Sequence, residues 1–184
     1  SGRMLTIISR MSDLRNNGTP DMEFAVSGLL ARSQLAGGRG EDARRTVLAL
    51  REQFEERGLT RFFPNMDAML CRIALHTGDL DEADAWYRAK APREPTHINI
   101  LKRYQYYTQA MVELANGKPD SALLTLTPME PYCTACMRYI DTVHLKVLAA
   151  IALYQKKDEM WREPLTAALA LAEEYRFIRT LSVY

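Results

Sequence analysis

The sequence predicts an all-α fold, a superhelical array of antiparallel helix pairs, on the basis of two observations. First, one turn-like stretch recurs along the chain. It consists of an apolar helix end, a glycine three residues later, a polar turn, and an alanine five residues after the glycine. The glycines are Gly38, Gly78 and Gly117, and their regular spacing of about 40 residues is typical of stacked helical repeats. Second, no segment of useful length alternates apolar and polar residues as a half-buried strand would.

Three positions relative to the glycine carry the same kind of residue in successive repeats. Seven residues before it stand small residues, Ala31, Cys71, Ala110 and Ala149. Three before it stand leucines, Leu35, Leu75, Leu114 and Leu153, and five after it come Ala43, Ala83 and Ala122. In a fourth copy Lys156 replaces the glycine and Trp161 replaces the alanine. Small residues let helix axes approach closely, so these columns predict helix pairs that turn at the three glycines and near Lys156.

The first half of the chain divides at proline, glycine and capping signals. Apolar residues at helical spacing from Met4 to Leu14 predict an opening helix that ends at Asn16-Asn17-Gly18. It has no partner before it and is interpreted as the second half of a repeat. Thr19 and Pro20 then start a helix that runs from Pro20 to Ala36. Its return helix runs from Glu41 to Arg57 and stops at Gly58.

The second half follows the same scheme. The second repeat has a helix from Asn65 to His76 and another from the capping Asp79 to about Ala91. In the third, Thr96 caps a long helix through Ala115, and Pro119 starts a short return helix that ends near Thr127. The fourth has a helix from Tyr132 to Lys156 and one through Tyr175 that Pro164 starts late or kinks. The prediction is one domain over 1–184, a piece of a longer chain, with a half repeat at 1–17 and repeats at about 19–58, 60–91, 96–127 and 132–176.

Composition and charge exclude several function classes. The net charge is +1, from 24 basic and 23 acidic residues, whereas a protein that binds nucleic acid through phosphates has a strong basic excess. The longest apolar run, from Val147 to Tyr154, is too short to cross a bilayer. No signal-peptide pattern opens the chain, and three cysteines do not make a disulfide framework. We therefore expect a cytoplasmic protein that binds neither DNA nor membrane.

The repeat pattern of small residue, glycine and alanine around an acidic, capped turn resembles the tetratricopeptide repeat, although the period here is longer than that of the standard repeat. Turns such as His76 to Ala83 and the tail from Pro164 to Arg179 are similar to the helical sensor region of MalT-like, ATP-dependent LuxR-type bacterial transcriptional regulators. In that family a nucleotide-binding motor precedes the array and a helix-turn-helix follows it. The resemblance implies ATP only for such a motor, since this sequence contains no phosphate-binding GxxxxGK[ST] loop. We expect no cofactor in this domain.

The sequence offers only weak candidates for a catalytic or metal-binding site. Cys133 and Cys136 have a spacing that metal and redox sites use, but no second cysteine pair completes a zinc site, and His144 is the nearest further ligand. No strand precedes them as in a thioredoxin-like redox unit. We interpret both as packing residues and expect no metal. His76, His97 and His144 are scattered, without a nucleophile and carboxylate set, so we expect no enzyme.

The remaining candidate is the inner face of the array, which the first helix of each pair lines. Arg32 and Arg72 occupy the same position in neighbouring repeats, six residues before the glycine. Tyr107 and Lys146 share the column ten residues before it, and Tyr104 lies one turn earlier. Guanidinium groups bind anionic or hydroxylated ligands through paired hydrogen bonds. The alternative is a solvated face whose arginine stems cover the core.

We therefore expect a non-catalytic repeat domain that senses a small-molecule inducer or a protein or peptide partner within a LuxR-type transcriptional regulator. The resemblance implies that binding biases the motor between resting and self-associating states. The alternative function is a stand-alone adaptor, similar to other tetratricopeptide-repeat proteins, that binds a protein or peptide and has no link to transcription.

Overall fold

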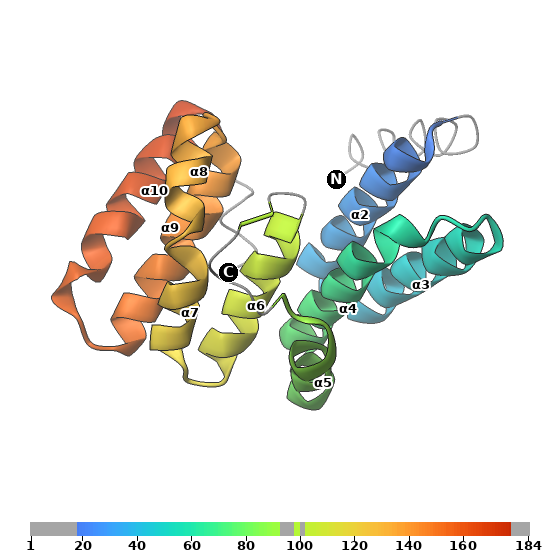
Figure 1. The fold of residues 1–184 in the computed structure, drawn as a ribbon, viewed down its shortest axis with the longest axis horizontal. Helices are drawn as coiled ribbons and strands as arrows, with labels where there is room; N and C mark the ends of the chain where they lie inside the picture. Colours follow the sequence, from blue (N-terminus) through green and yellow to red (C-terminus); the bar gives the residue numbers. More distant parts are fainter. Residues whose placement is uncertain (1–17, 93–97, 100–101, 178–184) are drawn as a thin grey trace. The chain divides into compact units, whose positions relative to one another are not determined.

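The structure is a computed structural model that describes residues 18–92, 98–99 and 102–177 (Figure 1). Every element in these ranges is helical, and none of them is a strand, so the predicted all-α fold is confirmed. The α-helices are α2 (Pro20–Ala36), α3 (Gly40–Glu56), α4 (Phe63–Thr77), α5 (Leu80–Lys90), α6 (Arg103–Ala115), α7 (Pro119–Leu126), α8 (Met129–Ala135), α9 (Tyr139–Gln155) and α10 (Arg162–Glu174). Short 3-10 turns, Thr60–Phe62 and Glu159–Trp161, precede α4 and α10. The predicted half repeat at 1–17 and the cap at Thr96 lie outside the described residues.

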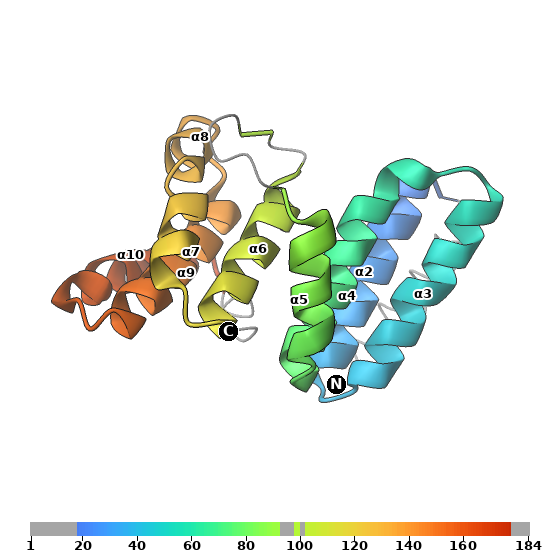
Figure 2. The same cartoon turned by 60° about the horizontal axis from the view of Figure 1, so that its bottom comes forward.

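The helices form two compact units that divide between Asp79 and Leu80. In the first unit α2, α3 and α4 lie side by side, as both views show (Figures 1 and 2). Its core contains Val47, Phe54 and Met66, all essentially inaccessible. The ring of Phe62 packs edge-on against Phe54 with 4.9 Å between the ring centroids. Burial of such large apolar side chains is the main stabilising contribution in a helix stack.

The second unit contains α5 to α10. Helices α6, α7 and α9 enclose a core that includes Tyr106, Leu126 and Leu148. Val143 and Val147 on α9 pack against Ala168 and Ala172 on α10. The small alanines of α10 allow the close antiparallel approach that the sequence predicts for a repeat pair. The predicted alanines after the turns, Ala43, Ala83 and Ala122, are completely buried.

Most of the described turns share one backbone geometry. A residue in the left-handed conformation closes them at Gly38, Gly58, Gly78, Gly117, Met137, Lys157 and Arg176, whereas Thr127 and Pro128 between α7 and α8 keep right-handed conformations. The amide after that residue donates to a carbonyl five residues back, as from Lys118 to Glu113 (2.8 Å) and from Asp158 to Leu153 (3.0 Å). This is the Schellman C-cap, which satisfies carbonyls that the helix end leaves unpaired. The left-handed residues follow one another at nearly equal steps along the sequence, except that the step from Gly78 to Gly117 is twice as long as the others.

Two parts of the sequence prediction are wrong. The fourth turn forms near Lys156 as predicted, but its left-handed residue is Lys157 (φ 59°), so the repeat positions assigned from Lys156 are shifted by one residue. The buried small residue there is Ala150, 4% exposed, and not Ala149, which is half-buried. The predicted helix from Tyr132 to Lys156 is interrupted: α8 ends at Ala135 and α9 begins at Tyr139. The sequence carries no glycine at either turn. Lys157 and Met137 occupy the left-handed positions instead.

Candidate functional site

The two predicted arginines lie at the same level of the first unit. A methyl group added at Gly28 of α2 would lie 2.8 Å from the Cε atom of Met69 on α4, so the two helices approach closely there. Because α2 and α4 both run antiparallel to α3, Arg32 and Arg72 come one turn after this contact on neighbouring helices. Arg32 is exposed and Arg72 is half-buried.

An apolar stripe accompanies Arg32 on the exposed face of α2, a feature that the sequence analysis missed. Met22 is 43% exposed and Leu29 is 54% exposed. They belong to a set of exposed residues spaced three and four apart, which places them on one face of the helix: Met22, Ala25, Leu29, Arg32 and Ala36. The sequence does contain a signal for this stripe: apolar residues occupy more than one face of α2, and one of these faces therefore has no helix to pack against.

Tyr107 does not line a surface as predicted. It is 3% exposed, and its hydroxyl donates a hydrogen bond of 3.0 Å to the carbonyl oxygen of Asp141. The same hydroxyl lies 3.7 Å from the Sγ atom of Cys133. Tyr107 therefore joins α6 to α8 and α9 inside the second unit. Tyr104, one turn earlier, is half-buried.

Lys146 is also placed differently from the prediction. With the fourth turn at Lys157, the residue equivalent to Tyr107 is Val147, which is buried. Lys146 lies beside that column, and its ammonium forms an ion pair with Glu130 on α8 at 3.2 Å. The two arginines belong to the first unit, and Tyr104, Tyr107 and Lys146 belong to the second.

Charged and thiol side chains gather where α6, α8 and α9 meet. Asp141, nearly buried, accepts from Arg138 and forms a second ion pair with Arg103 at 3.5 Å. Hydrogen bonding to this carboxylate raises the pKa of the Arg138 guanidinium. One carboxylate thus binds arginines from two parts of the chain, and these charge-assisted contacts join the start of α6 to the start of α9.

The two cysteines of the Cys133 to Cys136 motif differ in environment. Cys133 is buried, and burial raises the pKa of its thiol, which disfavours the reactive thiolate. Cys136 is exposed at the end of α8, where its hydrogen bond with Tyr132 raises the pKa of that phenol. Within residues 18–92, 98–99 and 102–177 no three His, Cys, Asp or Glu side chains are grouped so as to hold a metal ion.

Glu113 is the second feature that sequence reasoning missed. It is 2% exposed, and neutral donors from three helices surround its carboxylate. Oε1 accepts from the Tyr87 hydroxyl (3.0 Å), the Gln109 amide (3.1 Å) and the Ser121 hydroxyl (3.0 Å), and Oε2 accepts from Thr125 (2.9 Å). Such a carboxylate holds α5, α6 and α7 together, because it accepts hydrogen bonds from a side chain of each of these three helices.

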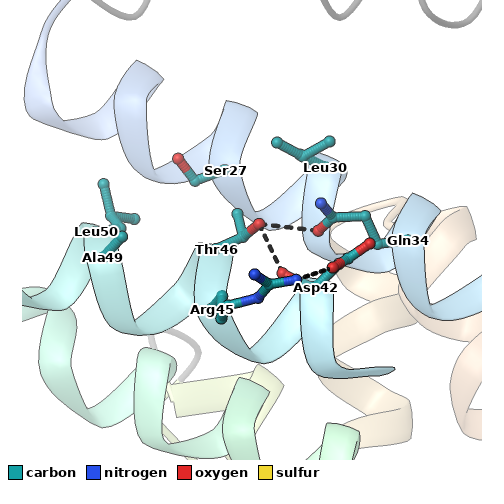
Figure 3. Close-up of a pocket in the computed structure, with 8 residues that line it drawn as sticks. All are labelled: Ser27, Leu30, Gln34, Asp42, Arg45, Thr46, Ala49 and Leu50. Atoms are coloured by element: carbon teal, nitrogen blue, oxygen red, sulfur yellow. Dashed lines mark hydrogen bonds and ion pairs between the residues drawn. The ribbon is translucent and has the colours of Figure 1, made fainter. Parts of the chain in front are cut away.

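A groove of about 320 Å³ runs between α2 and α3 (Figure 3). Its lining is Ser27, Leu30, Gln34, Asp42, Arg45, Thr46, Ala49 and Leu50. The Thr46 hydroxyl lies 2.9 Å from both Oε1 of Gln34 and the carbonyl oxygen of Asp42, and Arg45 pairs with the Asp42 carboxylate. The polar side chains that meet in this view therefore bind one another (Figure 3).

None of the helices in the described ranges is long and apolar enough to span a membrane. In a comparison with protein families, a family model for the MalT-like TPR region matches residues 11–182. Searches of curated proteins and of solved structures found no match.

Proposed function

Since this chain belongs to the MalT-like tetratricopeptide-repeat family, we propose that it is the sensing array of a bacterial, LuxR-type transcriptional regulator. In this role it binds a small-molecule inducer or a protein partner and transmits the binding to a nucleotide-dependent motor. The observation that carries the proposal is the family match, which extends over almost the whole chain and agrees with the helical repeats of both units.

We also propose that the chain is not an enzyme. Helical repeats of this family are generally non-catalytic. The buried polar groups support this reading, because the Glu113 carboxylate and the Tyr107 hydroxyl are held by neighbouring side chains inside the second unit rather than presented to a substrate. Function in such folds is located on surfaces.

The proposed binding surface is the face of α2 and α4 that carries Arg32 and Arg72. The exposed apolar residues Met22 and Leu29 continue this face along α2. An apolar stripe that ends at guanidinium groups suits an anionic or hydroxylated ligand with an apolar part. Within the second unit, Tyr104 and Lys146 remain separate candidates for a binding role, whereas Tyr107 acts only by positioning helices.

The exposed apolar residues also favour the second candidate function, a stand-alone adaptor. Patches of this kind bind the apolar face of a partner segment. The full-length gene product distinguishes the two candidates. A phosphate-binding loop upstream and a helix-turn-helix downstream are expected for the regulator, and a gene product without them would favour the adaptor.

A further inference from the structure

The motif from Cys133 to Cys136 is a feature of the sequence that the proposed function does not use. Cys133 is 1% exposed and lies inside the second unit, as expected of a packing residue. Cys136, three residues later, is exposed at the end of α8, so the packing role that the sequence predicts for it is wrong. An exposed thiol therefore lies one helical turn from a buried one.

The backbone brings the two cysteines within disulfide distance. The amide of Cys136 donates a helical hydrogen bond of 3.0 Å to the carbonyl oxygen of Tyr132, so the last helical turn includes both cysteines. Residues three apart in such a turn have Cα atoms about 5 Å from each other. Disulfides join cysteines whose Cα atoms are about 4.4–6.8 Å apart. The two sulfur atoms also interact electrostatically: burial is the main cause of the raised pKa of Cys133, and the charge of a Cys136 thiolate adds to it.

Arginine side chains near the motif favour ionised sulfur. Burial raises the pKa of the Cys133 thiol, and the charge of Arg138 partly offsets this effect. The hydrogen bond to Cys136 raises the pKa of the Tyr132 phenol, and Arg138 and Arg103 act on the same phenol in the opposite direction. Both arginines are therefore close to the motif. Nearby positive charge stabilises a thiolate, which is the nucleophilic form of cysteine.

We propose that Cys133 and Cys136 form a redox modification site, which hydrogen peroxide oxidises to an intramolecular disulfide. The exposed Cys136 reacts first. Its thiolate attacks one peroxide oxygen, the O–O bond breaks, and a sulfenic acid and a hydroxide form; the hydroxide takes up the proton that the thiol had lost. The sulfur of Cys133 then attacks the sulfenic sulfur, the S–O bond breaks, and the departing hydroxide and the proton of the Cys133 thiol form water. The net reaction moves two electrons from two thiols to one peroxide and yields one disulfide and two water molecules.

Oxidation acts beyond the motif through Cys133. Its Sγ atom lies 3.7 Å from the hydroxyl of Tyr107, which donates to the carbonyl oxygen of Asp141 on α9. Its carbonyl oxygen accepts the cap hydrogen bond from the Arg138 amide (2.9 Å), across the turn between α8 and α9. A disulfide requires Cβ atoms about 3.8 Å apart, closer than an undistorted helical turn holds them, so its formation distorts the end of α8. We therefore expect oxidation to loosen this turn.

Peroxide treatment of the full chain tests the proposal. The reduced protein is exposed to hydrogen peroxide, the remaining thiols are alkylated, and mass spectrometry of peptides identifies the state of each cysteine. We expect the thiols of Cys133 and Cys136 to be lost together into a disulfide that dithiothreitol reverses, at least about tenfold faster than the thiol of Cys71 is lost. Cys71 is the matched control within the chain, since it is buried and has no other cysteine one turn away in the sequence. Equal rates at the three cysteines, or oxidation without a disulfide between Cys133 and Cys136, would overturn the proposal.

Two variants assign the order of the steps. In Cys136→Ser we expect Cys133 to stay reduced, because it is buried and has lost the exposed thiol that reacts first. In Cys133→Ser we expect Cys136 to stop at the sulfenic acid, which dimedone traps. Circular dichroism monitors the fold, and Cys136→Ser, at an exposed position, keeps the test valid if Cys133→Ser does not fold. Oxidation of Cys133 at the wild-type rate in Cys136→Ser would contradict the proposed order of attack.

Hydrogen exchange measures the effect on the turn. The amide of Arg138 makes the cap hydrogen bond to Cys133, so we expect it to exchange at least about tenfold faster in the oxidised wild type than in the reduced protein. Peroxide is expected to leave this exchange rate unchanged in Cys136→Ser. The same rate in the oxidised and reduced wild type would show that the disulfide does not act on the turn.

Discussion

At the scale of single residues, the conformation of one residue decides where each helix turns. Gly78 adopts a φ of 84° without steric cost, whereas Lys157 (φ 59°) and Met137 (φ 50°) place a Cβ atom in the left-handed region. For residues other than glycine this conformation costs about 1–2 kcal/mol. The hydrogen bonds of the C-cap offset that cost at Lys157 and Met137, which is why a turn can form there without glycine.

Lys157→Gly is therefore expected to raise the free energy of unfolding by about 1 kcal/mol, since it removes the strain of the left-handed lysine. Urea denaturation of the full chain measures this change. Lys156→Gly is the matched control. Lys156 has a helical φ of −75° and pairs with Asp120, so glycine there is expected to lower stability. If only the Lys156 variant were stabilised, the turn would be centred where the repeat columns of the sequence place it.

Glu113 gives the second prediction at this scale. Glu113→Ala removes the acceptor of Tyr87, Gln109, Ser121 and Thr125 together and leaves a buried cavity. We expect the free energy of unfolding to fall by at least about 2 kcal/mol, because each unsatisfied buried donor is costly. Glu173→Ala, at an exposed position of α10, is expected to change it by less than about 0.5 kcal/mol. Equal, small effects would mean that the carboxylate does not hold the three helices together.

At the scale of elements, the start of α9 and the end of α10 meet through two tyrosines. The rings of Tyr139 and Tyr175 stack with 4.2 Å between their centroids. The hydrogen bond with Tyr139, followed by partial burial, raises the pKa of Tyr175 from 10.0 to about 12. Since the neutral phenol is favoured in the folded protein, the contribution of Tyr175 to stability is complete below pH 10.0. It is lost as the pH rises toward about 12.

Tyr139→Phe is expected to keep the ring stack and to lower the pKa of Tyr175 toward 10.0, because it removes only the hydroxyl partner. Titration of the Tyr175 ring by NMR measures the change. Phe177→Leu serves as the control, since Phe177 stacks on Tyr175 without a polar group. A Tyr175 pKa that stayed near 12 in Tyr139→Phe would assign the shift to burial or to Glu174 instead.

Most of the elements could be predicted from the sequence, and the failures have physical causes. Pro20 and Pro119 mark helix starts because the first helical residue needs no amide donor, and α2 and α7 begin at these two prolines. The break between α8 and α9 could not be predicted, since Met137 carries no turn signal. Among the candidate site residues, Tyr107 was wrongly predicted to lie on the surface. Its position in the repeat is the same whether its ring is exposed or its hydroxyl has a buried partner, so the sequence could not distinguish the two.

At the scale of the whole molecule, the balance of charge limits the kinds of partner. A net charge of +1 leaves little excess to neutralise phosphates. We expect the chain by itself to bind duplex DNA more weakly than micromolar at physiological salt. Fluorescence anisotropy with labelled duplexes measures this, and micromolar binding that weakens steeply with added salt would contradict the expectation.

We propose that the face of α2 and α4 around Arg32 and Arg72 binds the signal. Native mass spectrometry of the chain incubated with a metabolite extract and with size-fractionated proteins tests it most directly, on the wild type and on the Arg32→Ala, Arg72→Ala double variant. Arg44→Ala with Arg45→Ala, on α3, is the control for loss of two positive charges, and circular dichroism monitors the fold. We predict an adduct on the wild type and the control that is lost from the double variant while helicity is unchanged. An adduct of equal abundance on all three proteins would contradict the claim.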